Sequence, residues 1–215
     1  MDINTVCCTL FLLTCTGVCF GQELILPEGI NKAVGENVVI TPISIPEQPH
    51  LFIRWMFKKD TILSGPPDEI TLQPQYTDRV NLDTSTLALE IRSLTESDTG
   101  SYSLFVDTVD KRLTSVTSLQ VLVPASNVVI VPSNTELLEF NSTVSLVCSA
   151  SGSSLSFIWL NGSSEVTAGE QVQLTNSNSN LTITSVIRGE TGPYQCEASN
   201  SISNAESSIE PHHLL

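Results

Sequence analysis

The fold of this 215-residue chain is decided by one stretch near its C-terminal end, Glu190-Thr191-Gly192-Pro193-Tyr194-Gln195-Cys196. The stretch places a carboxylate, a glycine, a tyrosine and a cysteine at intervals of two residues. A second copy occurs earlier as Asp98-Thr99-Gly100-Ser101-Tyr102-Ser103-Leu104, in which Leu104 stands where the cysteine would be. This internal repeat predicts two domains of one kind, of which only the second has the cysteine.

The segments upstream of the two copies are related as well. Trp55 lies 47 residues before Tyr102, and Trp159 lies 35 residues before Tyr194. An apolar strand precedes each tryptophan, at Val38–Pro42 in the first repeat and at Val144–Cys148 in the second. The first domain therefore has Pro42 and Leu104 where the second has Cys148 and Cys196.

This order of Cys148, Trp159, Tyr194 and Cys196 resembles that of an immunoglobulin sandwich. The resemblance implies that Trp55, Tyr102, Trp159 and Tyr194 are structural residues of the two cores. It also implies that the cysteines join the two sheets of the second domain. A chance cysteine pair in a Ser-rich chain is the alternative. In the first domain Ile40, Trp55 and Leu104 are expected to supply the core without a disulfide.

Apolar and polar residues alternate over many short runs, which indicates an all-β chain. Strands are expected, among other places, at Leu24–Pro27, Tyr76–Val80 and Leu87–Ile91. The longer interval from tryptophan to tyrosine in the first domain suits the additional C′ and C″ strands of a variable-type domain. The predicted fold is thus two tandem immunoglobulin-like β-sandwiches, the first V-type without the inter-sheet disulfide and the second C2/I-type with it. The V-type resemblance further implies that Arg79 pairs with Asp98, the alternative being a solvated arginine.

The N-terminal segment has the properties of a secretory signal. Residues 6–20 are largely apolar, and cleavage is expected before Gln22, although the segment has no Lys or Arg before the apolar run. The alternative, a membrane anchor, is disfavoured because the run is short for a span of about 20 residues. The expected organisation is a signal peptide at 1–21, a V-type domain at 22–123 and a C2/I-type domain at 124–215, whose last strand would be cut short by Pro211.

Removal of the signal leaves two cysteines, Cys148 and Cys196, and an even pair in an exported chain favours a disulfide. No second long apolar run follows, so the chain is predicted to be extracellular, either secreted or part of the ectodomain of a plasma-membrane protein. After removal of Asp2, 22 acidic residues face 9 basic ones, a net charge of −13. This charge argues against nucleic acid or an anionic membrane surface as a partner.

The second domain contains three Asn-X-Ser/Thr sequons, and residues 22–123 contain none. The sequons begin at Asn141, Asn161 and Asn180, near predicted turns or strand ends where a glycan fits. Because Ser, Thr and Asn are abundant here, one of the three matches can be accidental.

The chain resembles the carcinoembryonic-antigen-related cell-adhesion molecule (CEACAM) family over residues 22–210. The resemblance lies in the unbridged first domain, the bridged second domain and three motifs: His50–Phe52 before Trp55, Asp98–Leu104, and Thr191–Glu197. Residues 76–80 also resemble hepatocyte-type adhesion molecules. The resemblance implies homophilic or heterophilic adhesion through the G-F-C-C′ sheet of the first domain.

Alternation of side chains along the strands points to the same sheet. If Trp55 and Leu104 face the core, the outward side chains include an aromatic, an arginine and a methionine, which are typical of protein interfaces. The predicted protein-binding residues are Phe52, Arg54, Met56, Phe105, Asp107 and Ile62. A strand register shifted by one residue, or a loop over the patch, is the alternative.

A catalytic role is not predicted. The histidines are His50, His212 and His213, and none is tied to a Ser or Cys nucleophile. No cofactor, metal, small-molecule substrate or nucleic acid is expected, and the partner is expected to be protein: the chain itself in a weak homodimer, or a related surface protein. A soluble decoy or immune-receptor ectodomain that binds an unrelated protein or microbial ligand is the alternative function. The lymphocyte adhesion family also has an unbridged first domain, but its second domain commonly has an additional disulfide.

Overall fold

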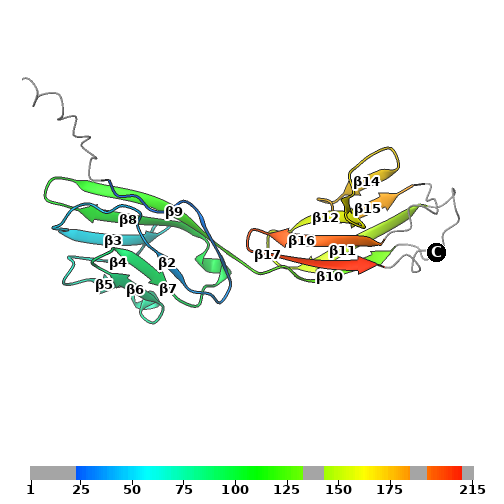
Figure 1. The fold of residues 1–215 in the computed structure, drawn as a ribbon. Coiled ribbons are helices and arrows are strands. Elements are labelled where there is room, and N and C mark those ends of the chain that lie inside the picture. Colours follow the sequence, from blue (N-terminus) through cyan, green and yellow to red (C-terminus); the bar gives the residue numbers. More distant parts are fainter. Residues whose placement is uncertain (1–22, 133–142, 185–192, 210–215) are drawn as a thin grey trace, which may run out of the picture.

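The computed structural model describes residues 23–132, 143–184 and 193–209. They form two β-sandwiches placed end to end and joined by a short linker (Figure 1). The predicted signal peptide, the sequon at Asn141 and the start of the Glu190–Cys196 stretch lie outside the described residues. The bounds of the domains therefore remain predictions, whereas the two sandwiches are observed.

The first sandwich has a six-stranded and a three-stranded sheet. The larger sheet has the order β1 (Ile30–Ala33), β9 (Arg112–Leu122), β8 (Gly100–Asp107), β3 (Phe52–Phe57), β4 (Asp60–Gly65), β5 (Thr71–Leu72). The smaller sheet has the order β2 (Val38–Ile40), β7 (Ala88–Ile91), β6 (Val80–Asp83). Strand β1 runs parallel to β9 and the other pairs are antiparallel. Strands β4 and β5 are the additional strands of a V-type domain, as the sequence predicts.

The second sandwich has two four-stranded sheets. One has the order β10 (Ser126–Pro132), β11 (Val144–Ser151), β15 (Asn180–Ile183), β14 (Val172–Thr175). The other has the order β13 (Ser164–Glu165), β12 (Ser156–Asn161), β16 (Tyr194–Asn200), β17 (Ser203–Ile209). Fewer strands between β12 and β16 make this the C2/I-type domain.

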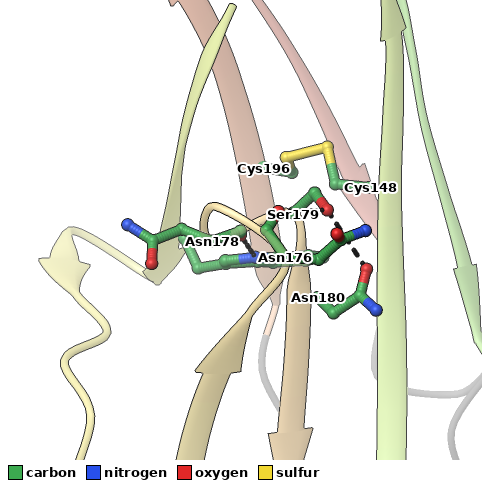
Figure 2. Close-up of a disulfide and its surroundings, with 7 residues drawn as sticks. Cys148, Asn176, Asn178, Ser179, Asn180 and Cys196 are labelled. Carbon is green, nitrogen blue, oxygen red and sulfur yellow. Dashed lines mark hydrogen bonds between the residues drawn. A yellow bond between two sulfur atoms is a disulfide. The ribbon is translucent and has the colours of Figure 1, made fainter.

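The core of the second sandwich is built around the Cys148–Cys196 disulfide, which joins β11 to β16. Trp159 is buried beside it and faces Cys196 across the β12–β16 pair. Its indole Nε1 donates a 2.8 Å hydrogen bond to the carbonyl of Asn178, in the turn before β15. Figure 2 shows this turn next to the disulfide. Asn178 has a positive φ of 65°, a conformation that asparagine tolerates better than most residues.

The core of the first sandwich has the same frame without cysteines. Trp55 faces Leu104 across the β3–β8 pair, and both are fully buried. The Trp55 indole Nε1 donates to the carbonyl of Leu87 at 3.2 Å. Leu87 is itself fully buried and also has a positive φ, of 61°. Packing of large apolar side chains thus replaces the covalent link.

The corner before β8 is held by a polar network around Asp98. The Tyr102 hydroxyl donates to the Asp98 carbonyl at 2.9 Å, which is the tyrosine corner of immunoglobulin-like domains. Arg79, in the turn just before β6, lies 2.6 Å from the Asp98 carboxylate. Thr95 donates to the same carboxylate from its backbone nitrogen and its hydroxyl, forming a capping box with the 3₁₀ helix η2 (Glu96–Asp98).

Two expected strands are absent from the described residues. Residues 24–27 contribute only an isolated bridge between Ile25 and Ser44. Around Tyr76 the chain forms the 3₁₀ helix η1 (Pro74–Tyr76) instead of a strand. Pro74 stands at the first helical position, where a proline fits because no backbone N–H is needed.

The linker is fixed to the second sandwich by hydrogen bonds. The Asn200 side-chain nitrogen donates to the carbonyls of Val123 and Ser153, both at 3.0 Å. The Ser153 hydroxyl accepts from the Val123 nitrogen at 2.7 Å, and the Ser203 hydroxyl accepts from the Ala125 nitrogen at 2.8 Å. The short connection is therefore bound along its length.

Candidate protein-binding face

The candidate site is the outer face of strands β4, β3, β8 and β9, here called the front face. Inward side chains of β3 and β8 are buried, and the outward ones alternate with them. The register is the one that the alternation predicts. The front face comprises the outward side chains Phe52, Arg54, Met56, Ser64, Ser103, Phe105, Asp107, Arg112, Thr114 and Val116.

Arg54 occupies the middle of the front face. It is paired with Phe105 on β8 and with Ser64 on β4. Its guanidinium carbon lies 5.5 Å from the centroid of the Phe52 ring, a cation–π distance. Each of Phe52, Arg54, Met56 and Phe105 is half-buried, so part of each side chain is available to a partner.

Asp107 forms a bidentate ion pair with Arg112 at the end of the β8–β9 hairpin. The two oxygen–nitrogen distances are 2.6 and 2.7 Å. The hydrogen bond from Arg112 is the main cause that lowers the pKa of Asp107, and the charges of Arg112 and Arg54 lower it further. The front face thus has two fixed charges. Arg112 holds the carboxylate of Asp107, and the guanidinium of Arg54 lies against the ring of Phe52.

Ile62 does not belong to the front face, and its prediction as a protein-binding residue is wrong. It is 1% exposed and packs in the core. The β3–β4 register shifts between Trp55 and Met56, where Trp55 pairs with Leu63 and Met56 with Thr61. Ile62 is therefore the extra residue of a β-bulge, and the bulge turns both Ile62 and Leu63 inward. Simple alternation does not anticipate this.

Val116 on β9 belongs to the front face and was missed by the sequence interpretation. It pairs with Ser103, which pairs with Met56, and it is 57% exposed. Alternation along β9 identifies it, because Thr117 and Leu119 face the core and Val116 therefore faces outward. Next to the front face a shallow depression of about 460 Å³ is lined by Leu51, Phe52 and residues 107–112.

The remaining predicted site residues lie away from the front face. Trp55, Tyr102, Trp159 and Tyr194 are buried in the two cores, and Asp98 is buried in the corner before β8. The sequon residues Asn161 and Asn180 are half-buried, at the end of β12 and the start of β15.

Within residues 23–132, 143–184 and 193–209, no three His, Cys, Asp or Glu side chains are grouped as metal ligands. The buried His50 ring contacts the Pro46 carbonyl, with 3.0 Å between Nε2 and the oxygen. In the same part of the chain, no helix is long and apolar enough to cross a membrane.

Comparison with known proteins agrees with this architecture. Residues 127–200 match the immunoglobulin domain family. The hepatic and glial cell adhesion molecule of Homo sapiens is 27% identical over 187 residues, which are 83% of this chain and 45% of that protein. The Mus musculus protein of the same name is 28% identical and is covered to 44%. The chain spans less than half the length of these curated relatives.

Solved structures share the whole two-domain arrangement. Murine CEACAM1b has a TM-score of 0.75 at 23% identity, over 87% of this chain and 98% of that one. A murine receptor solved with the mouse coronavirus receptor-binding domain has a TM-score of 0.73 at 24% identity, with the same two coverages. The fold and the front face together define a two-domain immunoglobulin-type module. Residues 127–200 thus match the immunoglobulin domain family, and the fold of both sandwiches together is immunoglobulin-like and similar to that of murine CEACAM1b.

Proposed function

We propose that this chain is an extracellular adhesion or recognition module that binds protein through the front face of its first sandwich. The proposal rests on the composition of that face, where Phe52, Arg54, Met56, Phe105 and Val116 are neighbours on paired strands. Aromatic, methionine and arginine side chains are enriched at protein interfaces, and arginine is enriched among the hot spots. The sequence of this sandwich also has no glycosylation sequon that would cover the face.

The names of the sequence relatives support adhesion. We propose weak homophilic binding, in which the front faces of two copies meet. The Asp107–Arg112 pair and Arg54 would give such a contact its charge complementarity. No catalytic step or cofactor is part of the proposal.

Sedimentation velocity of the secreted chain over a wide concentration range tests the proposal. The variant Arg54→Ala/Phe105→Ala is expected to stay monomeric where the parent dimerises, because each hot spot contributes about 2 kcal/mol or more to binding. The matched control is Arg92→Ala/Ile43→Ala, which also removes one exposed arginine and one exposed apolar side chain, but away from the front face. Dimerisation that survives in the front-face variant would contradict the proposal.

A second candidate is heterophilic binding, as a receptor ectodomain or a soluble decoy. It is favoured by the depression beside the front face, where Leu51 just before β3 and Val109 at the tip of the β8–β9 hairpin are exposed. Such a hollow suits a protruding loop of an unrelated protein better than a second flat sheet. The murine receptor with the same fold was solved bound to a viral protein. A parent chain that stays monomeric at all concentrations would favour this candidate.

A further inference from the structure

An apolar stripe lies on the outer face of the second sandwich and plays no part in its core. Val129 and Val131 on β10 and Val147 on β11 point outward and are 49, 54 and 40% exposed. The inward neighbours Ile130 and Leu146 already fill the core side of these strands. Strand β10 is the first strand in the order of its sheet, so the stripe lies at one side of the outer face of that sheet.

The strand register places a sequon residue beside this stripe. Val131 pairs with Val147 across β10–β11, and Val147 pairs with Asn180 across β11–β15. Adjacent strands are about 4.8 Å apart, so Val147 lies about 5 Å and Val131 about 10 Å from Asn180 along this row. Thr182, the third residue of the sequon, lies on the same face, with its hydroxyl 2.9 Å from that of Ser145.

The orientation of the Asn180 amide suits a glycan that lies over Val147. Its Oδ1 accepts a 3.2 Å hydrogen bond from the Ser179 hydroxyl. Figure 2 shows the side chain leaning from β15 toward β11, with the oxygen toward Ser179 and the nitrogen turned away from it. This nitrogen is the atom to which an N-linked glycan is attached.

We propose that Asn180 carries an N-linked glycan whose first sugars lie over Val147 and Val131 and cover this apolar stripe. In the transfer, Nδ2 bonds to the anomeric carbon of a lipid-linked oligosaccharide, the lipid diphosphate leaves, and one amide proton is released. The C–H faces and N-acetyl methyl groups of the first two sugars give the valines an apolar partner. A glycan on Asn161 cannot do the same, because β12 belongs to the other sheet.

The test is hydroxyl-radical footprinting of the full chain secreted from glycosylating cells, with glycopeptide mass spectrometry to establish occupancy. The three proteins compared are the parent, Asn180→Gln and the matched control Asn161→Gln. Oxidation of Val131 and Val147 is expected to rise about twofold in Asn180→Gln if the glycan covers half of their exposed area, since protection follows the area removed from water. Ile43 in the first sandwich is the internal reference and should not change.

If Asn180→Gln is poorly secreted, enzymatic removal of glycans from the folded Asn161→Gln variant gives a comparison to which the Asn161 glycan does not contribute. An unoccupied Asn180 would overturn the inference. So would valine oxidation that is unchanged after the Asn180 glycan is lost, or that rises equally in Asn161→Gln. None of these results depends on whether the first sandwich binds a partner.

Discussion

Leu104 lies opposite Trp55 on adjacent strands, at the same register position at which Cys196 lies opposite Trp159. The other cysteine position is changed as well. Cys148 stands two residues beyond Leu146, and Pro42 stands two residues beyond the equivalent Ile40. Since proline has no backbone N–H, it suits the end of the β2 ladder. The first sandwich thus has packing where the second has a covalent bond.

The first prediction concerns that packing. Leu104→Ala should lower the free energy of unfolding of the first sandwich by about 2–5 kcal/mol, because it leaves a cavity against Trp55. Val116→Ala on the adjacent strand, at an exposed position, should change it by no more than about 0.5 kcal/mol. Urea denaturation followed by tryptophan fluorescence measures both. Equal midpoints for the two variants would show that Leu104 does not hold this core.

The second prediction concerns the covalent link. Replacing both Cys148 and Cys196 by alanine should destabilise the second sandwich by about 2–5 kcal/mol. The first sandwich serves as the internal control, since its unfolding transition should stay where it is. The measurement is hydrogen exchange read separately for β3 and β12. A shift of both transitions would instead mean that the two sandwiches unfold as one unit.

The third prediction concerns the pH dependence of the corner. Burial acts to raise the pKa of Asp98, but the hydrogen bonds from Arg79 and Thr95 outweigh it and the pKa is lowered from its usual value of 3.8. A carboxylate with a lowered pKa stabilises the fold above its unfolded-state pKa and loses this contribution as the pH falls through the folded-state value. Asp98→Asn should therefore be less stable than the parent at neutral pH, and the difference should shrink below about pH 4.

Thermal unfolding between neutral pH and pH 2 checks this expectation. Asp68→Asn, at an exposed position in the β4–β5 turn, is the control and should follow the parent at every pH. If the difference in unfolding temperature between Asp98→Asn and the parent stayed constant down to pH 2, the ionised carboxylate would not be what stabilises the corner.

The sequence predicts the two-sandwich frame because a few residues recur at the same spacing in both halves of the chain. A tryptophan, and after it an acidic residue four positions before a corner tyrosine, occur twice, and the cysteine pair that lies outside the predicted signal peptide fits only the second set. The Arg79–Asp98 contact and the outward positions of Arg54 and Phe105 follow from the same frame. The outward positions depend on the alternation of side chains, which the sequence carries directly, whereas the Arg79–Asp98 contact is implied by the V-type resemblance.

Other features depend on local backbone geometry or on partners distant in sequence. The bulge at Ile62 turns this side chain inward, where strict alternation would place it outward. Nothing in Thr61–Leu63 itself signals the bulge. The helical turn at Pro74–Tyr76 has a signal in its proline, which the alternation of residues 76–80 alone does not show. Val131, Val147 and Asn180 lie in one row only because β10, β11 and β15 pair in this register, and no single segment of the sequence encodes that pairing.

The fourth prediction concerns the linker. Asn200→Ala removes the two hydrogen bonds to the carbonyls of Val123 and Ser153, and with them the contact between the linker and the β11–β12 loop. The second sandwich should lose about 1–3 kcal/mol of stability, the usual cost of leaving a polar group unpaired. The angle between the sandwiches should also become more variable. Asn204→Ala is the matched control, because Asn204 is exposed on the neighbouring strand β17.

Spin labels at the exposed positions Thr86 and Thr175, one in each sandwich, report this angle as a distribution of distances. The distribution should broaden in Asn200→Ala and stay narrow in Asn204→Ala. A distribution that is already broad in the parent would show that the linker hydrogen bonds do not restrict the angle. An unchanged distribution in Asn200→Ala would assign the restriction to the hydrogen bonds that Ser153 and Ser203 accept from the linker. The front face would then keep its orientation relative to the second sandwich without Asn200.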